Sequence, residues 1–263
     1  MERFEGQVAI VTGAGSGIGE AIAVRLATEG AAVCVTDRYL SAAERVAEEV
    51  RVKGGAALAH HLEVTDYATV TTAVTWTREH LGPIDVLVNN AATAASTPFE
   101  ELSEQDWDRD IDVVLKGPFL CARAVLPEMV RRRSGVVLNV GSVNSFQFLG
   151  QDAYSAAKAG LVSLTRSIAV RYGRYGIRCN LVAPGTVRTP AWTARLAANP
   201  DLLDRLTRWY PLGRIGEVDD VAAAAAFLAS SEASWVSGTV LCVDGGLLAG
   251  NAIMANETAG DLC

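Results

Sequence analysis

The sequence of 263 residues lacks several features that would point to particular classes of protein. It has 5 cysteines, widely spaced and without a CxxC pair, and 3 histidines without metal-ligand spacing, so neither a disulfide framework nor a metal site is expected. Lys and Arg number 23 against 30 Asp and Glu, and the net charge of −7 disfavours nucleic acid as a partner. No apolar run is long enough to span a membrane, and a strand-like run at residue 7 leaves no room for a signal peptide. We therefore expect a cytoplasmic protein with no membrane partner.

Apolar residues make up 50% of the chain and fall into short runs that alternate with helix-length segments. The strand-like runs are 7–12, 31–36, 56–64, 84–89, 135–141, 177–183 and 238–244, and the helical segments include 17–29, 41–53, 66–80, 103–132, 152–172 and 217–230. Most strand-like runs are continuously apolar, which is typical of parallel strands covered on both faces. The pattern predicts a single α/β domain over residues 1–263, a Rossmann-like doubly wound parallel sheet of about seven strands with helices on both faces.

Two segments depart from this alternation. Residues 184–216 carry four prolines and two tryptophans and have no strand-like run, so we predict a substrate-binding loop or lid there. Residues 247–263 are mostly small and polar and end in Cys263. We predict that this C-terminal tail forms an arm on the surface or across an interface.

A glycine-rich turn follows the first strand-like run. The stretch "TGAGSGIGEAIA" at 12–23 has glycines at positions 13, 15, 17 and 19, and a helical pattern follows. Without Cβ atoms the backbone can approach a pyrophosphate, and the N–H groups of the first helical turn can bind its charge. Asp37 ends the next strand, 18 residues after Gly19, where an acid accepts hydrogen bonds from the adenosine ribose and repels a 2′-phosphate. Arg38 could pair with that phosphate, but we expect Asp37 to dominate and NAD to be preferred over NADP.

The order of the motifs resembles the short-chain dehydrogenase/reductase family. The spacing Gly13-x3-Gly17-x-Gly19 is similar to its TGxxxGxG motif, and "NNAA" (89–92) to its NNAG motif. Ser142 follows the fifth strand-like run, Tyr154 and Lys158 form YxxxK, and "PGTVRT" (184–189) follows the sixth. The resemblance runs in order from about residue 5 to "VDGG" at 243–246, which is nearly the whole chain.

The resemblance implies an oxidoreductase that interconverts a secondary alcohol and a ketone, with Ser142, Tyr154 and Lys158 as catalytic residues. Tyr154 and Lys158 share a helix face because residues i and i+4 are neighbours. We expect the lysine charge, together with an oxidised nicotinamide, to lower the pKa of the phenol. Tyr154 then acts as general acid and base, and the Ser142 hydroxyl polarises the same substrate oxygen.

The expected cofactor site follows from the motifs and from the resemblance. Its residues are Gly13, Ser16, Gly17, Ile18, Gly19, Asp37, Arg38, Glu63, Val64, Asn89, Ala91, Tyr154, Lys158, Pro184, Gly185, Val187 and Thr189. Glu63 stands where the family usually has an Asp facing the adenine, so that contact is open, although the Val64 backbone can serve. We interpret Asp66 as a helix cap.

One position departs from the family in a way that concerns the mechanism. The family's "VNLKG" is "VVLKG" here, so Val114 replaces an asparagine that belongs to a proton relay near the lysine. Valine cannot hydrogen-bond, and a relay through this position is therefore excluded.

The substrate side is expected to be largely apolar and aromatic. Candidate residues are Asn144, Phe148, Gln151, Trp192 and Trp209. The aromatic ones, with Phe146 and Tyr210, suit an apolar or cyclic alcohol or ketone, although several of them are expected to pack the lid onto the body instead. The 184–216 segment also has five arginines, which could bind an acidic substrate tail but are expected to be mostly solvated. The resemblance further implies a homotetramer.

Two other functions stay open. One is reduction of 3-oxoacyl groups on an acyl carrier protein with NADPH, for which Arg131–Arg133 or Arg171 and Arg174 would dock the acidic carrier. The other is a non-catalytic NAD-binding interaction protein, for which Val114 is the only hint in the sequence.

Overall fold

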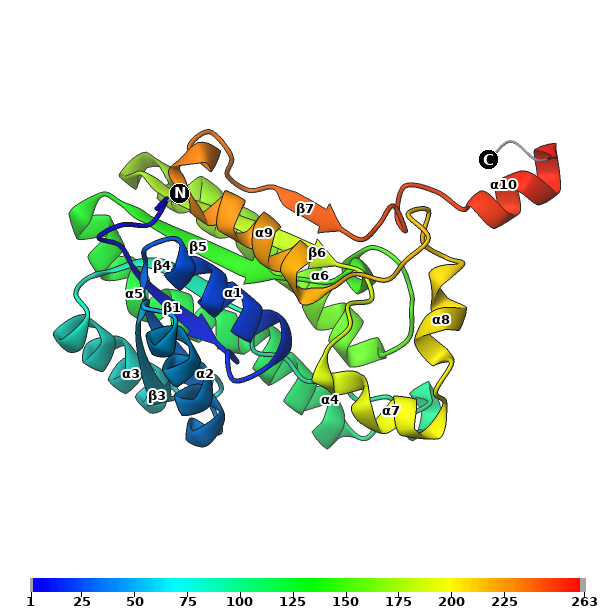
Figure 1. Ribbon diagram of the computed structural model, residues 1–263, viewed down its shortest axis with the longest axis horizontal. Helices are drawn as coiled ribbons and strands as arrows, with labels where there is room; N and C mark the ends of the chain where they lie inside the picture. The colour runs from blue at the N-terminus through cyan, green and yellow to red at the C-terminus, as the bar shows by residue number, and fades with distance from the viewer. Residues whose placement is uncertain (1, 261–263) are drawn as a thin grey trace.

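The computed structural model describes residues 2–260, and Cys263 with the rest of 261–263 lies outside the described residues. Seven strands form one parallel sheet in the order β3-β2-β1-β4-β5-β6-β7 (Figure 1). They are β1 (Val8–Thr12), β2 (Ala32–Asp37), β3 (Ala56–His61), β4 (Ile84–Asn89), β5 (Gly135–Val140), β6 (Ile177–Pro184) and β7 (Val240–Val243). The predicted fold class is confirmed. The strand order reverses between β1 and β4, and such a point opens a crevice at the carboxyl ends of the strands.

Helices cover both faces of the sheet (Figure 1). The longer ones are α1 (Gly17–Thr28), α2 (Leu40–Val52), α3 (Tyr67–His80), α5 (Gly117–Arg132), α6 (Asp152–Tyr172) and α9 (Val218–Ala229). One apolar core lies between the sheet and α1, α2 and α9, and a second lies between the sheet and α3, α5 and α6. Asp66 accepts a hydrogen bond from the Ala68 N–H at 2.9 Å and begins α3, which confirms the predicted cap. No helix within residues 2–260 is long and apolar enough to cross a membrane.

The helix expected over 103–132 is three consecutive segments. These are α4 (Glu104–Ile111), a π-helical turn (Asp112–Lys116) and α5. Pro118 has no N–H to donate to the Val114 carbonyl, so the regular α-helical ladder loses a bond at this point. Gly117 also lies tightly against Val64, because a Cβ at Gly117 would be 3.0 Å from the Val64 Cβ. The expected helix is therefore present from Glu104 to Arg132, and these local constraints, which apolar spacing does not contain, produce the π-helical turn in its middle.

The segment after β6 is helical in short pieces. A 3₁₀ turn (Pro190–Trp192) leads into α7 (Thr193–Ala198) and α8 (Leu202–Thr207). Leu203, Tyr210 and Ile215 form a small apolar cluster that is separate from the two cores on the sheet. The segment is therefore packed largely on its own residues.

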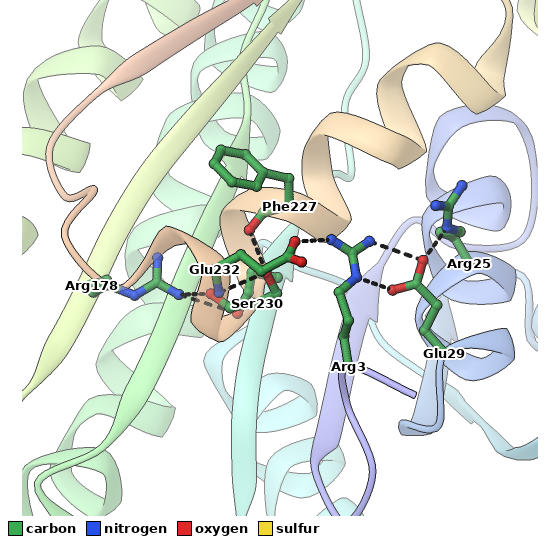
Figure 2. A network of polar contacts seen from close by, with 8 residues as sticks. Arg3, Arg25, Glu29, Arg178, Phe227, Ser230 and Glu232 are labelled. Atoms are coloured by element: carbon green, nitrogen blue, oxygen red, sulfur yellow. Dashed lines mark hydrogen bonds and ion pairs between the residues drawn. The ribbon is translucent and has the colours of Figure 1, made fainter. Parts of the chain in front are cut away.

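The N-terminal residues are bound to the body of the molecule, whereas the C-terminal helix extends away from it. Figure 2 shows Arg3 donating to Glu29, at the end of α1, and to Glu232, after α9, at 2.6 and 2.7 Å. Arg178 in β6 donates to the Leu228 and Ser230 carbonyls at 2.7 and 2.8 Å, which satisfies acceptors at the end of α9. In contrast α10 (Ala252–Ala259) has no buried residue and projects from the body of the molecule (Figure 1).

Candidate active site

The glycine-rich turn joins β1 to α1 with the backbone held close to its neighbours. Gly13 has φ +60°, and a Cβ there would be 2.7 Å from the Ala91 Cα. A Cβ at Gly19 would be 2.4 Å from the Gly13 carbonyl oxygen. The Ser16 side chain makes no capping hydrogen bond to α1, so the first N–H groups of the helix stay open to an anion. The turn fits a pyrophosphate.

Asp37 ends β2 beside this turn. Its Oδ2 accepts from the Gly15 N–H at 3.1 Å and its Oδ1 from the Tyr39 N–H at 3.0 Å. The neighbouring Arg38 guanidinium lies 4.6 Å from the centre of the Tyr39 ring and donates to its hydroxyl. The carboxylate is fixed by the backbone, whereas the exposed arginine is held by one aromatic side chain.

A cavity of about 450 Å³ lies over these residues. Its lining includes the expected cofactor residues Gly13, Ser16, Gly17, Ile18, Asp37, Arg38, Glu63, Val64, Ala91 and Thr189. The Glu63 side chain accepts from the Thr65 hydroxyl at 3.0 Å, which holds its carboxylate at the cavity wall.

The two asparagines of the "NNAA" motif have different surroundings. Asn89 is 3% exposed, and its amide donates to the Asn139 Oδ1 at 2.8 Å inside the sheet. Asn89 lines neither this cavity nor the second one, described next, whereas Asn90 lines both. The side-chain amide of Asn90 donates to the Thr12 and Gly13 carbonyls at 3.0 and 2.9 Å. We expected a cofactor-site role for Asn89, and the geometry favours Asn90.

A second cavity, of about 760 Å³, brings together Ser142, Tyr154 and Lys158. Ser142 follows β5, and its oxygen accepts from the Asn144 N–H at 3.1 Å. Tyr154 and Lys158 lie in the first half of α6, and the Lys158 Nζ is 5.4 Å from the centre of the Tyr154 ring. Lys158 is 2% exposed and donates to the Val140 carbonyl at 2.5 Å. The sequence brings three chemistry-bearing side chains to one wall.

Burial dominates the acid–base properties of this pair. It raises the pKa of Tyr154 to about 12, although a hydrogen bond to Ser142 lowers this pKa and the charge of Asp110 raises it further. Burial also lowers the pKa of Lys158 to about 7. We expected the lysine, together with an oxidised nicotinamide, to lower the pKa of the phenol. Without the nicotinamide, burial holds the pKa of Tyr154 above its usual value, so a phenolate needs further positive charge beside it.

The helix that carries Val114 holds an acid that the sequence did not single out. Val114 is fully buried, and Asp110, one turn before it in α4, is fully buried as well. The Asp110 Oδ2 accepts from the Ala95 N–H at 2.8 Å, and its Oδ1 has no hydrogen-bond partner among the described residues. The carboxylate thus fixes the loop after β4 and reaches Tyr154 electrostatically. In the sequence, the signal that could have identified Asp110 is its position four residues, about one helical turn, before Val114.

The substrate side of the second cavity holds four of the five expected residues, Asn144, Phe148, Gln151 and Trp192. Trp209 instead lines a neighbouring cavity of about 1090 Å³. Ser96 and Arg195 line the catalytic cavity and were not singled out. Arg195 could have been chosen only as one of five arginines in its segment.

The two cavities adjoin, because Ile18, Asn90, Ala92 and Thr189 line both. Pro184, Gly185 and Val187 complete the wall between the glycine turn and Tyr154. A dinucleotide could extend from Asp37 past the turn to the catalytic side chains. The residues present therefore fit a nicotinamide dinucleotide.

Known proteins are similar to this chain over almost its whole length. Residues 13–248 match the sequence pattern of a family described as Enoyl-(Acyl carrier protein) reductase. An uncharacterized oxidoreductase of Schizosaccharomyces pombe is 46% identical over 254 residues, 96% of this chain and 95% of its own. The structure of an oxidoreductase from Burkholderia thailandensis, of the short-chain dehydrogenase/reductase family, is 42% identical with a TM-score of 0.90, covering 96% of each chain. A gluconate 5-dehydrogenase from Burkholderia cenocepacia, in complex with NADP and tartrate, is 36% identical with a TM-score of 0.89, covering 95% of this chain and 98% of its own.

Proposed function

Because this chain belongs to the short-chain dehydrogenase/reductase family of oxidoreductases, we propose that it interconverts a secondary alcohol and a ketone with NAD(H). The observation that carries the proposal is that Ser142, Tyr154 and Lys158 share a cavity that adjoins the cavity at the glycine turn.

The chain's own residues would handle the proton. When bound, the cofactor supplies the hydride acceptor or donor and, in its oxidised form, a positive charge beside the phenol. Tyr154 Oη takes the substrate hydroxyl proton in oxidation and returns it in reduction. The Ser142 oxygen is fixed by the Asn144 N–H, and its hydroxyl, which donates to the Asn144 Oδ1 at 3.1 Å, would turn to donate to the substrate oxygen. Lys158, held at the Val140 carbonyl, keeps a donor beside the ring of Tyr154.

Our choice of NAD rests on Asp37. Its carboxylate is held at the end of β2 by two backbone N–H groups, so it could not easily move away from a 2′-phosphate. The gluconate 5-dehydrogenase neighbour binds NADP, so family membership does not decide the cofactor. We expect tighter binding of NADH than of NADPH.

The substrate we propose has an apolar or cyclic body. Phe148 and Trp192 lie in the wall of the catalytic cavity, and Leu149 lies with them. Apolar walls with a few polar groups at one point are typical of small-molecule sites. A homotetramer and a cytoplasmic location belong to the same proposal and rest on the sequence.

The test compares the wild type with Tyr154→Phe and, as a control on the same helix, Tyr172→Phe. Substrates are cyclic and aliphatic secondary alcohols with NAD⁺ or NADP⁺, and the matching ketones with NADH or NADPH. We expect Tyr154→Phe to lose about 10²- to 10⁴-fold in kcat, since a general acid–base group is removed. NADH binding, followed by fluorescence, should stay within about threefold, and Tyr172→Phe should be unaffected.

Three outcomes contradict parts of the proposal. Equal turnover by wild type and Tyr154→Phe removes the catalytic role of the tyrosine. Preference for NADPH with 3-oxoacyl thioesters supports the carrier-protein reductase. The description of the matched family names a different reduction on acyl carrier protein, that of an enoyl C=C bond. Binding of NADH without any turnover favours the non-catalytic interpretation.

A further inference from the structure

The five arginines of the 184–216 segment have different surroundings in the structure. Arg214 pairs with Asp220 at 2.6 Å, and Arg188 lies 3.4 Å from Glu217. Arg205 lies on α8, and Arg208 lines the neighbouring cavity, with its guanidinium 4.9 Å from the centre of the Trp209 ring. Only Arg195, among these five, lines the cavity that holds Tyr154. It forms no ion pair with any carboxylate of residues 2–260.

Arg195 is held in place by neutral groups. Its Nη2 donates to the Ser96 hydroxyl at 2.5 Å, and its guanidinium lies 5.3 Å from the centre of the Trp192 ring. The Trp192 Nε1 in turn donates to the Val187 carbonyl at 2.9 Å, which fixes the indole. The Gln151 amide donates to the same Ser96 hydroxyl at 3.3 Å. A cation and an amide from two distant segments therefore meet at one hydroxyl in the cavity wall.

This arrangement leaves donors unused. A guanidinium has five N–H groups in a planar fork that matches a carboxylate. The Ser96 hydroxyl takes one of them, and the stacked ring leaves the edge of the fork open. An arginine positioned in this way is preorganised for an anion, because little side-chain freedom is lost on binding.

The charges in the cavity favour a carboxylate over a phosphate. Apart from Arg195, its charged residues are Lys158 and Asp152. Lys158 is deeply buried at the Val140 carbonyl beside Tyr154, and Asp152 lies in the first turn of α6, where the helix dipole stabilises it. One available cation matches one negative charge, whereas a phosphate dianion would require more.

We propose that the substrate carries a carboxylate that binds to Arg195, with Ser96 and Gln151 beside it, while its hydroxyl-bearing carbon lies at Tyr154. The substrate class is then a hydroxy acid, or the corresponding keto acid, whose apolar or cyclic body separates the two groups. This inference rests on the proposed function. The carboxylate contact lies away from the reacting carbon, so it stabilises ground state and transition state alike and is expressed in KM.

The experiment compares four proteins, namely the wild type, Arg195→Gln, Arg195→Lys and the control Arg208→Gln. Arg208 is a fair control because it also stacks on a tryptophan of the same segment but lines only the neighbouring cavity. Each protein is assayed with NAD⁺ on 3-hydroxycyclohexanecarboxylate, on its methyl ester and on 3-hydroxycyclohexylmethyl phosphate. A set of open-chain hydroxy acids and their methyl esters varies the distance between the hydroxyl and the carboxylate.

We expect the wild type to prefer acids over their esters. Arg195→Gln should raise KM for the acids by about 10- to 100-fold, the range for a charge-assisted hydrogen bond, and leave the esters within about twofold. For the acids, the KM of Arg195→Lys should lie between those of the wild type and Arg195→Gln, because lysine keeps the charge but not the planar fork of N–H donors. Arg208→Gln should match the wild type. Equal KM values for acid and ester in the wild type, an equal effect of Arg195→Gln on both, or preference for the phosphate would each overturn the proposal.

A binding measurement separates this inference from the proposed function. Calorimetry of the acid and of its ester is carried out on the wild type and on Arg195→Gln, each saturated with NADH, and needs no turnover. Binding of the acid that depends on Arg195 supports the carboxylate site even if no alcohol is oxidised, in which case the proposed function fails alone. Turnover of esters and acids alike, with no effect of Arg195 on binding, leaves the proposed function standing and refutes the carboxylate site.

Discussion

At the scale of single residues, Lys158 is a buried cation without an acidic partner in the part of the chain that the structure describes. It is 2% exposed, no acid pairs with it among the described residues, and its Nζ donates to a backbone carbonyl. Burial of an ammonium without an anionic partner lowers its pKa, here to about 7. The side chain therefore loses its proton more readily than an ordinary lysine. Its protonation state should affect both the protein's stability and the charge beside Tyr154.

The lowered pKa of Lys158 predicts that stability rises with pH between about 7 and 8.5. In this window the unfolded chain, with an ordinary lysine, binds more protons than the folded protein, so raising the pH favours the folded state. We expect the free energy of unfolding to increase by about 1 to 2 kcal/mol over this range in the wild type. Lys158→Met should lack the increase, as measured by urea unfolding at several pH values.

Comparing the wild type with Lys158→Met separates the contribution of Lys158 from those of other titrating groups. Burial raises the pKa of the Cys34, Cys121 and Cys179 thiols, which lowers stability as the pH nears 9, and it does so equally in both proteins. Parallel pH profiles for the wild type and Lys158→Met would mean that the lysine keeps an ordinary pKa in the folded protein.

At the scale of secondary-structure elements, α9 depends on small side chains. Its run of alanines includes Ala222, Ala225 and Ala226, all essentially fully buried, in the core that α9 shares with α1. Ala225→Leu adds three carbons where there is no space, and we expect a loss of about 1 to 3 kcal/mol from overpacking. Ala223, on the exposed face of the same helix, provides the control, and Ala223→Leu should change stability by less than about 0.5 kcal/mol. Urea midpoints measure both, and equal losses would refute close packing of α9.

At the scale of the whole molecule, apolar surface remains open in the single chain. A groove between α5 and α6 is lined by Phe119, Leu126, Val130 and Leu164, and the Phe119 side chain is 47% exposed. For the proposed homotetramer, light scattering should give a mass of roughly four times the 27.7 kDa of one chain. Phe119→Glu places a charge in the groove and should reduce that mass. A wild-type mass of 27.7 kDa would show a monomer and contradict the assembly.

The fold could be predicted from the sequence because most of the parallel strands are continuous apolar runs that alternate with helical segments. Ser142 and Asp37 could be placed at the same edge of the sheet because carboxyl ends of parallel strands share one edge. Other features depend on details that periodicity does not contain. Whether Asn89 or Asn90 faces the cavity depends on the side to which the last strand residue points.

The other features that the sequence did not predict arise from the three-dimensional packing of the chain. The raised pKa of Tyr154 follows from burial, which is a property of the packed chain. Arg195 comes from the short helix α7, and Ser96, its partner in the cavity wall, comes from a loop 99 residues earlier in the sequence. A contact between a short helix and a distant loop leaves no pattern in either one.

The separate packing of the segment after β6 has a consequence for how enzymes of this kind can diverge. Leu203, Tyr210 and Ile215 give the segment its own apolar nucleus. One bond that joins it to the rest of the chain runs from the Leu212 N–H to the Gly245 carbonyl at 3.2 Å. Recombination or grafting of this one stretch between related genes can therefore exchange substrate recognition while the hydride-transfer machinery is inherited intact. New specificities then arise without rebuilding the sheet.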